Sequence, residues 1–192
     1  MRKLIPIFLL AVVLFASCEE KENVKETLRL MQSHPVCLPL DEMQCCFRGN
    51  DTVMLDSIKH DFRLVVYVDS TECSPCLLDK MFIWNDRLED AKKTPGQLKH
   101  IFIFAPKPEQ LEDAYLSLQY CGLESPVYID TAFAFRKKNP YFPENRIYHT
   151  FLLDRNDSIL LVGNPINNQK LDSIFKQIIK FSNNQIINNY DK

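Results

Sequence analysis

A buried strand that leads directly into a cysteine pair is the feature that most constrains the fold of this chain. The run Arg63-Leu64-Val65-Val66-Tyr67-Val68-Asp69 is apolar and β-branched, which is typical of a strand covered on both faces. Cys73-Ser74-Pro75-Cys76 follows it closely, and from Pro75 to Lys93 the apolar residues recur at helical spacing. The sequence therefore predicts a strand and a helix that are joined at two cysteines.

Hydrophobic periodicity and turn residues predict the other elements. The expected strands are 63–69, 100–104, 126–129, 146–153 and 158–162, and the expected helices are 23–33, 75–93, 108–122, 131–138 and 168–181. Asp154-Arg155-Asn156-Asp157 predicts a hairpin between the last two strands, and Trp84 is expected in the core. This order predicts an α/β fold whose central mixed sheet has a parallel βαβ half and an antiparallel hairpin, flanked by helices and preceded by an irregular N-terminal extension.

The position of the cysteine pair favours redox chemistry. At a helix start, unpaired backbone N–H groups and the helix dipole stabilise a thiolate, and Pro75 is tolerated in the first helical turn. We assign Cys73 as the nucleophile and Cys76, one turn later, as the resolving thiol. Two alternatives remain open: an inert disulfide, and a structural zinc site that would need further ligands such as Cys45-Cys46 or His149.

The chain resembles the thioredoxin superfamily, in particular the TlpA-like or redoxin-like envelope thiol-disulfide oxidoreductases. The resemblance covers about Asp61 to Phe181 and includes the strand 64–68, the Cys73-Ser74-Pro75-Cys76 motif, the strand 100–104, and Thr150-Phe151-Leu152-Leu153-Asp154 with its hairpin. It implies a thioredoxin-like fold and a catalytic dithiol at Cys73 and Cys76, with Ser74, Pro75 and Tyr148 at the substrate groove and no cofactor.

Three residues depart from the family's pattern. Glu72 stands where a tryptophan usually precedes the first cysteine, and a carboxylate there should raise the pKa of the Cys73 thiol. Tyr148 and His149 stand where a cis-proline is usual, which predicts a trans peptide bond. Tyr67 falls near the place of the family's buried acid. His149 could stabilise the thiolate or move a proton, although a solvent-facing strand residue is the simpler interpretation.

The first residues are typical of a lipoprotein signal peptide. Arg2 and Lys3 precede an apolar run of 13 residues, too short to span a bilayer, and Phe15-Ala16-Ser17-Cys18 resembles a cleavage site at which Cys18 is lipidated. An ordinary secretory signal is the alternative. Without Arg2 and Lys3, 21 basic residues stand against 25 acidic ones, so no basic surface for nucleic acid is expected.

The seven cysteines fit an exported protein, in which disulfides persist. Beyond Cys18, Cys73 and Cys76 the chain has four cysteines, at positions 37, 45, 46 and 121. A disulfide between Cys37 and Cys45 or Cys46 is a plausible staple for the extension, whereas Cys121 is expected to be buried at a helix end.

These features predict a lipid-anchored thiol-disulfide oxidoreductase of the bacterial envelope, periplasm-facing or surface-exposed. The expected segments are a signal peptide at 1–17, a tether and extension at 18–60, a thioredoxin-like domain at 61–182 and a polar tail at 183–192. Its expected partners are disulfides of exported proteins or a partner thiol-disulfide reductase. A non-catalytic binding lipoprotein is the alternative, and a thiol peroxidase is disfavoured because the residues before Cys73 lack that class's proline and threonine or serine pattern.

Overall fold

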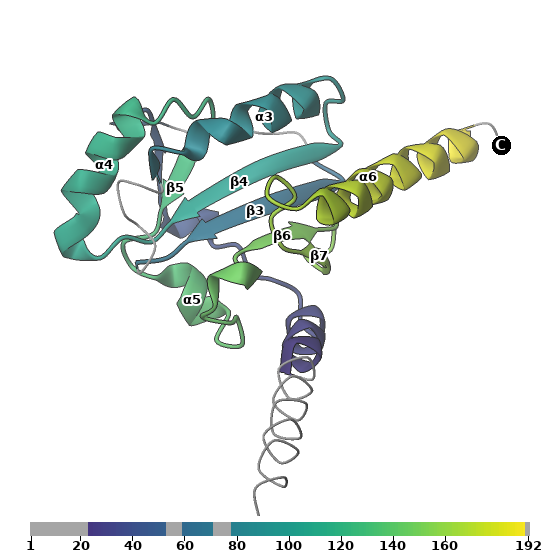
Figure 1. Ribbon diagram of the computed structural model, residues 1–192, viewed down its shortest axis with the longest axis horizontal. Coiled ribbons are helices and arrows are strands. Elements are labelled where there is room, and N and C mark those ends of the chain that lie inside the picture. Colours follow the sequence, from purple (N-terminus) through teal and green to yellow (C-terminus); the bar gives the residue numbers. More distant parts are fainter. Residues whose placement is uncertain (1–22, 53–58, 71–77, 191–192) are drawn as a thin grey trace, which may run out of the picture.

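A mixed β-sheet forms the centre of the computed structural model shown in Figure 1, which describes residues 23–52, 59–70 and 78–190, with side chains up to residue 180. Its strands are β1 (Gln44–Phe47), β2 (Asn50–Asp51), β3 (Phe62–Val68), β4 (Leu98–Phe104), β5 (Val127–Ile129), β6 (Thr150–Leu153) and β7 (Ile159–Val162). The helical elements are residues 23–32, η1 (Leu40–Glu42), η2 (Met81–Trp84), α3 (Asn85–Lys92), η3 (Pro108–Gln110), α4 (Leu111–Tyr120), α5 (Ala134–Lys138), η4 (Arg146–Tyr148) and α6 (Gln169–Tyr190).

The strand order confirms the predicted fold class. In the described residues the sheet runs β2-β1-β5-β4-β3-β6-β7. Strands β3, β4 and β5 are parallel, while β6 pairs antiparallel with β3 and β7 pairs antiparallel with β6. A parallel unit followed by an antiparallel hairpin in one sheet is the thioredoxin-like arrangement.

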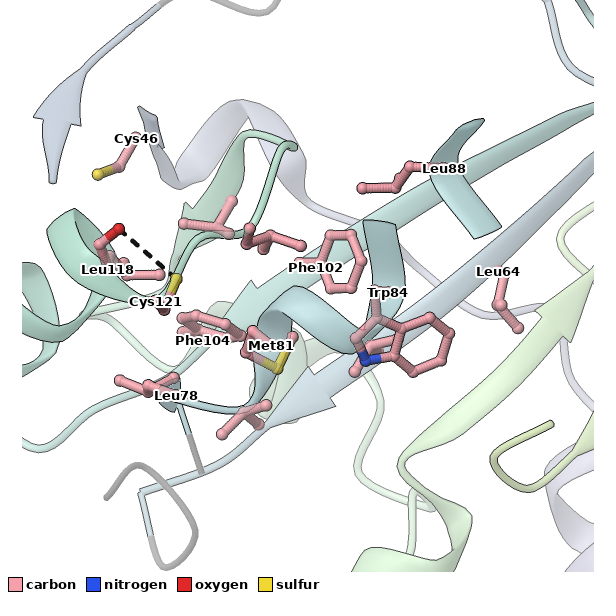
Figure 2. Packing of buried hydrophobic residues seen from close by; sticks show 14 of the residues in the cluster. Cys46, Leu64, Leu78, Met81, Trp84, Leu88, Phe102, Phe104, Leu118 and Cys121 are labelled. Carbon is pink, nitrogen blue, oxygen red and sulfur yellow. Dashed lines mark hydrogen bonds between the residues drawn. The ribbon is translucent and has the colours of Figure 1, made fainter. Parts of the chain in front are cut away.

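Alternating residues of the central strands build a core on each face of the sheet. On one face, Phe102 of β4 packs with Trp84 and with Leu88 of α3, and this first cluster also contains residues of α4 and α6 (Figure 2). On the other face, Tyr67 of β3 packs with Phe135 of α5 and with Met31 of the N-terminal helical segment. Figure 1 shows α3 and α4 on one side of the sheet and α5 and residues 23–32 on the other.

The N-terminal extension is more regular than the sequence suggests. Strand β1 pairs antiparallel with β5 and forms a tight hairpin with β2, turned by Arg48 and Gly49 at φ 50° and 75°. Strand β1 has only four residues, too few to show a periodic pattern in the sequence. Its two adjacent cysteines face opposite sides of the sheet: Cys46 belongs to the first cluster, and Cys45 packs against the cluster around Tyr67, which we call the second cluster. The extension therefore supplies part of the sheet.

Three predicted boundaries differ in the structure. The described part of the expected 75–93 helix is broken by a turn at 79–80 and continues as η2 and then α3. The strand expected from 146 begins only at Thr150, because residues 146–148 form the η4 turn. Helix α6 continues to Tyr190, so residues 183–190 of the polar tail are helical, beyond the expected helix end at 181. No helix in the described part of the chain has both the length and the apolar character needed to cross a membrane.

Candidate functional site

The described residues on both sides of the cysteine motif are anchored in the first cluster. The predicted residues Cys73, Ser74, Pro75 and Cys76 lie outside the described residues, as does Cys18. Val68, at the carboxyl end of β3, is 3% exposed, and Leu78, two residues beyond Cys76, is 1% exposed. The segment that carries the motif thus follows the carboxyl end of β3, in the parallel part of the sheet. The carboxyl ends of parallel strands are where α/β proteins place their binding and catalytic sites.

A groove with a volume of about 600 Å³ lies beside these ends, between β3, η2, η4 and the loop that leads into α6. Ile83 and Ile147 line it and are 39% and 55% exposed. Asn164, Asn167 and Asn168 line it from the loop before α6. We call this cavity the β3–β6 groove. Apolar side chains together with amides suit a polypeptide segment, because they offer both apolar contact and hydrogen bonds to a backbone.

His149 lines the β3–β6 groove, but its side chain is buried rather than solvent-facing, so the simpler interpretation of this residue is wrong. Its imidazole Nε2 lies 3.0 Å from Nη2 of Arg136 and 3.1 Å from the carbonyl oxygen of Pro143. A guanidinium only donates hydrogen bonds and a carbonyl oxygen only accepts them, so Nε2 accepts from Arg136 in one tautomer of the ring and donates to Pro143 in the other. The bond to Arg136 gives His149 a role in holding the neighbouring loop.

The backbone at this position confirms the predicted trans peptide. The described residues contain no cis peptide bond. Of the two residues expected near this place, His149 directly precedes β6, and its carbonyl oxygen accepts a hydrogen bond from the backbone N–H of Tyr67 at 2.9 Å. Tyr148 is 7% exposed, packs in the second cluster and does not line the β3–β6 groove. Ile147 borders the groove in its place.

Arg136, which the sequence does not single out, joins several segments near the carboxyl end of β3. Its Nη1 donates hydrogen bonds to the carbonyl oxygens of Phe142 and Pro143, both at 2.8 Å. Its Nη2 lies 3.4 Å from a carboxylate oxygen of Asp69, just after β3. Arg136 therefore fixes the loop between α5 and η4 against the carboxyl end of β3. The sequence offers only a basic residue on a short helix as a signal for this role.

Tyr67, which the resemblance places near an expected buried acid, is itself buried. Its side chain is 2% exposed, and its hydroxyl has no hydrogen-bond partner among the described residues. Burial raises the pKa of Tyr67 to about 12, and the positive charge of Arg136 offsets part of that effect. The phenol is therefore protonated at neutral pH and can donate a hydrogen bond but cannot act as a base. Asp69, two residues later, is the nearby carboxylate that sequence reasoning missed.

The four other cysteines are free thiols, so the predicted disulfide of Cys37 with Cys45 or Cys46 is wrong. Cys37 is exposed, whereas Cys46 and Cys121 are buried. The Cys121 Sγ lies 3.6 Å from the carbonyl oxygen of Leu118 at the end of α4, which confirms its expected position (Figure 2). Within residues 23–52, 59–70 and 78–190, no three His, Cys, Asp or Glu side chains are grouped to hold a metal ion.

The sequence matches no protein-family model and no curated protein. Among similar solved structures, a proposed protein disulfide isomerase from Bacteroides thetaiotaomicron is 21% identical over 70% of this chain and 82% of that one, with a TM-score of 0.49. Peroxiredoxin Q from Xanthomonas campestris is 13% identical over 79% and 93%, with a TM-score of 0.47. A thioredoxin-like protein in its oxidised form is 14% identical over 79% and 97%, with a TM-score of 0.44. At these values the fold assignment rests on the strand order and not on the likeness.

Proposed function

We propose that the protein is a thiol-disulfide oxidoreductase that uses Cys73 and Cys76 as its dithiol. One observation carries the proposal: the motif directly follows the strand β3 in a thioredoxin-like mixed sheet, between the buried residues Val68 and Leu78. A helix start at the end of such a strand is where backbone N–H groups stabilise a thiolate.

The reaction transfers two electrons from the dithiol of one partner to the disulfide of the other. The Cys73 thiolate attacks one sulfur of a substrate disulfide and forms a mixed disulfide, and the other substrate sulfur leaves as a thiolate. The Cys76 thiolate then attacks the Cys73 sulfur, which releases the second substrate thiolate and leaves a Cys73–Cys76 disulfide. The substrate is reduced and the protein oxidised, and the reverse sequence oxidises a substrate dithiol.

The β3–β6 groove supports a polypeptide as the substrate. Ile83 and Ile147 provide exposed apolar contacts at its border, and asparagines line the side towards α6. Disulfides of exported proteins, or the dithiol of a partner reductase, are polypeptide substrates of this kind. His149 and Tyr67 also line this groove.

The cellular setting that we propose is the bacterial envelope, with a lipid anchor on Cys18. The support comes from the sequence, in which Arg2 and Lys3, the apolar run and Phe15-Ala16-Ser17-Cys18 follow in the order of a lipoprotein signal. Several acyl chains on one cysteine give stable anchoring, which a single chain does not. Replacement of Cys18 by Ser should release the protein from the membrane fraction and abolish incorporation of labelled palmitate, and retention of label in that variant contradicts the anchor.

A non-catalytic binding lipoprotein is the second candidate, and the trans peptide before β6 favours it. The family's cis-proline orients substrate at the dithiol, whereas here a buried His149 bonded to Arg136 occupies that neighbourhood. A protein of this kind would use the β3–β6 groove to hold a polypeptide without exchanging disulfides.

Titration against a glutathione redox buffer separates the two candidates. The full chain, purified from membranes in detergent, should show a reversible two-electron transition that is lost in Cys73→Ser. The Cys76→Ser variant should trap mixed disulfides in cells, and Cys37→Ser serves as the matched control because Cys37 is exposed but lies outside the motif. If Cys73 is alkylated no faster than an ordinary thiol at neutral pH and Cys76→Ser traps nothing, the binding protein is the correct reading.

A further inference from the structure

A second cavity lies on the face of the sheet opposite Tyr67, between α3 and α6 and above the start of β4. Its volume is about 220 Å³. Ala91 of α3, Leu98 of β4, and Phe175 and Ile179 of α6 give it apolar walls, and the imidazole of His100 also lines it. An engineered apolar cavity of about 150 Å³ is enough to bind benzene, so this one can hold a single ring with a short substituent.

His100 is the unexplained group in this cavity. It is 5% exposed, and both ring nitrogens are buried without a hydrogen-bond partner among the described residues. Its ring neighbours are aromatic: the Trp84 and Phe102 rings lie 6.2 Å and 6.4 Å from it between centroids. Burial, together with the positive charge of Arg87, lowers the pKa of His100 to about 4, so at neutral pH the imidazole has one donor and one acceptor. Leaving such groups unpaired in a core destabilises the fold.

The border of the cavity has an excess of positive charge. Among the described side chains, Arg87, Lys176 and Lys180 line it, against one carboxylate, Asp90. Arg87 and Lys176 both pair with Asp172, at 2.6 Å and 2.8 Å. Asp90 itself pairs with Lys93 at 2.6 Å. The basic side chains therefore outnumber the acidic ones, which favours a ligand with a negative outer end.

We propose that this cavity binds a small aromatic acid, with its ring between α3 and α6, its carboxylate at the basic border and a hydroxyl group bonded to His100. Such a ligand matches the size of the cavity and the charge at its border, and its hydroxyl offers a partner to the buried imidazole of the lining residue His100. Because both imidazole nitrogens are sealed from water, we expect the His100 ring to rotate when the hydroxyl binds. The proposal does not use the dithiol, since the described residues that line the cavity lie on α3, on β4 with the turn before it, and on α6.

Trp84 provides the measurement, because it is the only tryptophan of the chain and lies beside His100. The probes are para-hydroxyphenylpropionate, phenylpropionate, which lacks the hydroxyl, and para-ethylphenol, which lacks the carboxylate. We expect saturable quenching of Trp84 by the first probe, with affinity about fivefold to tenfold higher than for phenylpropionate, the usual value of one hydrogen bond. Para-ethylphenol should bind more weakly as well, by an amount that decreases at high salt.

Two variants decide the outcome. His100→Phe keeps an aromatic ring at the floor, so it should fold and lose the preference for the hydroxylated probe. Ala91→Phe should fill the cavity and abolish quenching by every probe, and thermal unfolding will show whether it is folded. Lys92→Met, on the exposed side of α3, is the control that should change nothing. Absence of saturable binding in the wild-type chain, or a hydroxyl preference that persists in His100→Phe, overturns the proposal. Binding that is equal in Cys73→Ser and wild type separates it from the proposed redox function.

Discussion

The guanidinium of Arg136 lies over the ring of Tyr67, with 5.3 Å between the Cζ atom and the ring centroid. The same guanidinium holds two loop carbonyls and the imidazole of His149. One side chain thus connects the carboxyl end of β3 with the residues that enter β6. These are the two strand ends between which the β3–β6 groove lies, so the geometry of the groove depends on a residue outside it.

Replacement of Arg136 by Met should therefore destabilise the fold. The change leaves the buried carbonyl of Phe142 without its donor and removes a cation from two aromatic rings. The expected loss in the free energy of unfolding is about 2 to 4 kcal/mol, measured by urea denaturation. Arg136→Lys should recover only part of it, because an ammonium cannot reach both carbonyls with the geometry of the guanidinium.

Lys93→Met is the control for that measurement. The Lys93 and Asp90 side chains are 72% and 63% exposed and form an ion pair at 2.6 Å on the surface. Such an exposed pair contributes little to stability, so the variant should unfold almost as the wild type does. Equal losses for the two variants would contradict the central role that we give to Arg136.

His100 should make the stability depend on pH below neutrality. Its pKa in the folded protein is about 4, against an ordinary value of 6.5. Between these values the unfolded chain binds a proton that the folded protein excludes, so the free energy of unfolding falls as the pH drops from 6.5 towards 4. Above pH 6.5 this titration does not lower the free energy of unfolding, and by pH 4 it lowers that free energy by an amount on the order of 3 kcal/mol.

Comparison with His100→Phe isolates this effect from the titration of carboxylates. The variant should be at least as stable as the wild type at neutral pH, and the difference in its favour should grow as the pH falls through that range. Denaturant midpoints of both proteins at several pH values measure it. Parallel pH profiles would mean that His100 finds a partner when protonated.

Gly163 should tolerate a side chain poorly. Its φ is 117°, and a Cβ atom there would lie 2.6 Å from Cδ1 of Leu171. Gly163→Ala must therefore strain the backbone and turn the Leu171 side chain aside, with an expected loss of about 2 to 3 kcal/mol in the free energy of unfolding. Gly122→Ala is the control: its φ is 71° and its Cβ would meet only Phe82, at 3.5 Å, so about 1 to 2 kcal/mol is expected. Thermal or urea unfolding of the two variants provides the comparison.

Apart from Cys18 and the two cysteines of the motif, the chain has four cysteines, and these should differ sharply in reactivity. Cys37 is exposed and should react with iodoacetamide in the folded protein. Cys46 and Cys121 are buried, and burial raises the pKa of both thiols, so they should react only when the chain unfolds. Peptide mapping by mass spectrometry after alkylation with and without denaturant distinguishes the sites. Rapid labelling of Cys46 in the native protein would show that β1 opens from the sheet.

The order of strands and helices could be predicted because each central strand is a long apolar run between clear turn residues. Phe62–Val68 and Leu98–Phe104 are buried on both faces, so each appears in the sequence as a continuous apolar run that can be recognised without knowing its neighbouring strands. Strand β1 gave no such signal, because four residues with two cysteines show neither alternation nor a continuous run. Its pairing with β5 depends on a partner more than 80 residues away in the sequence.

The contacts around the candidate site were harder to predict from the sequence than the fold was. Arg136 is a basic residue on a five-residue helix, and only the loop that folds back over α5 gives it buried acceptors. The sequence predicts His149 in a strand, but the η4 turn occupies 146–148, so the strand begins four residues later than expected and the imidazole contacts Arg136. Both errors concern contacts between distant segments, which periodicity does not report.

The pairing of β1 with β5 covers the edge that β5 would otherwise present. A fragment that began at Asp61 would leave the N–H and C=O groups along one side of β5 open to another chain. It would also uncover the apolar surface that Met31 and Met43 shield on the second face. Residues 23–52 therefore act as a built-in protection against aggregation, and a soluble form of the protein must keep them.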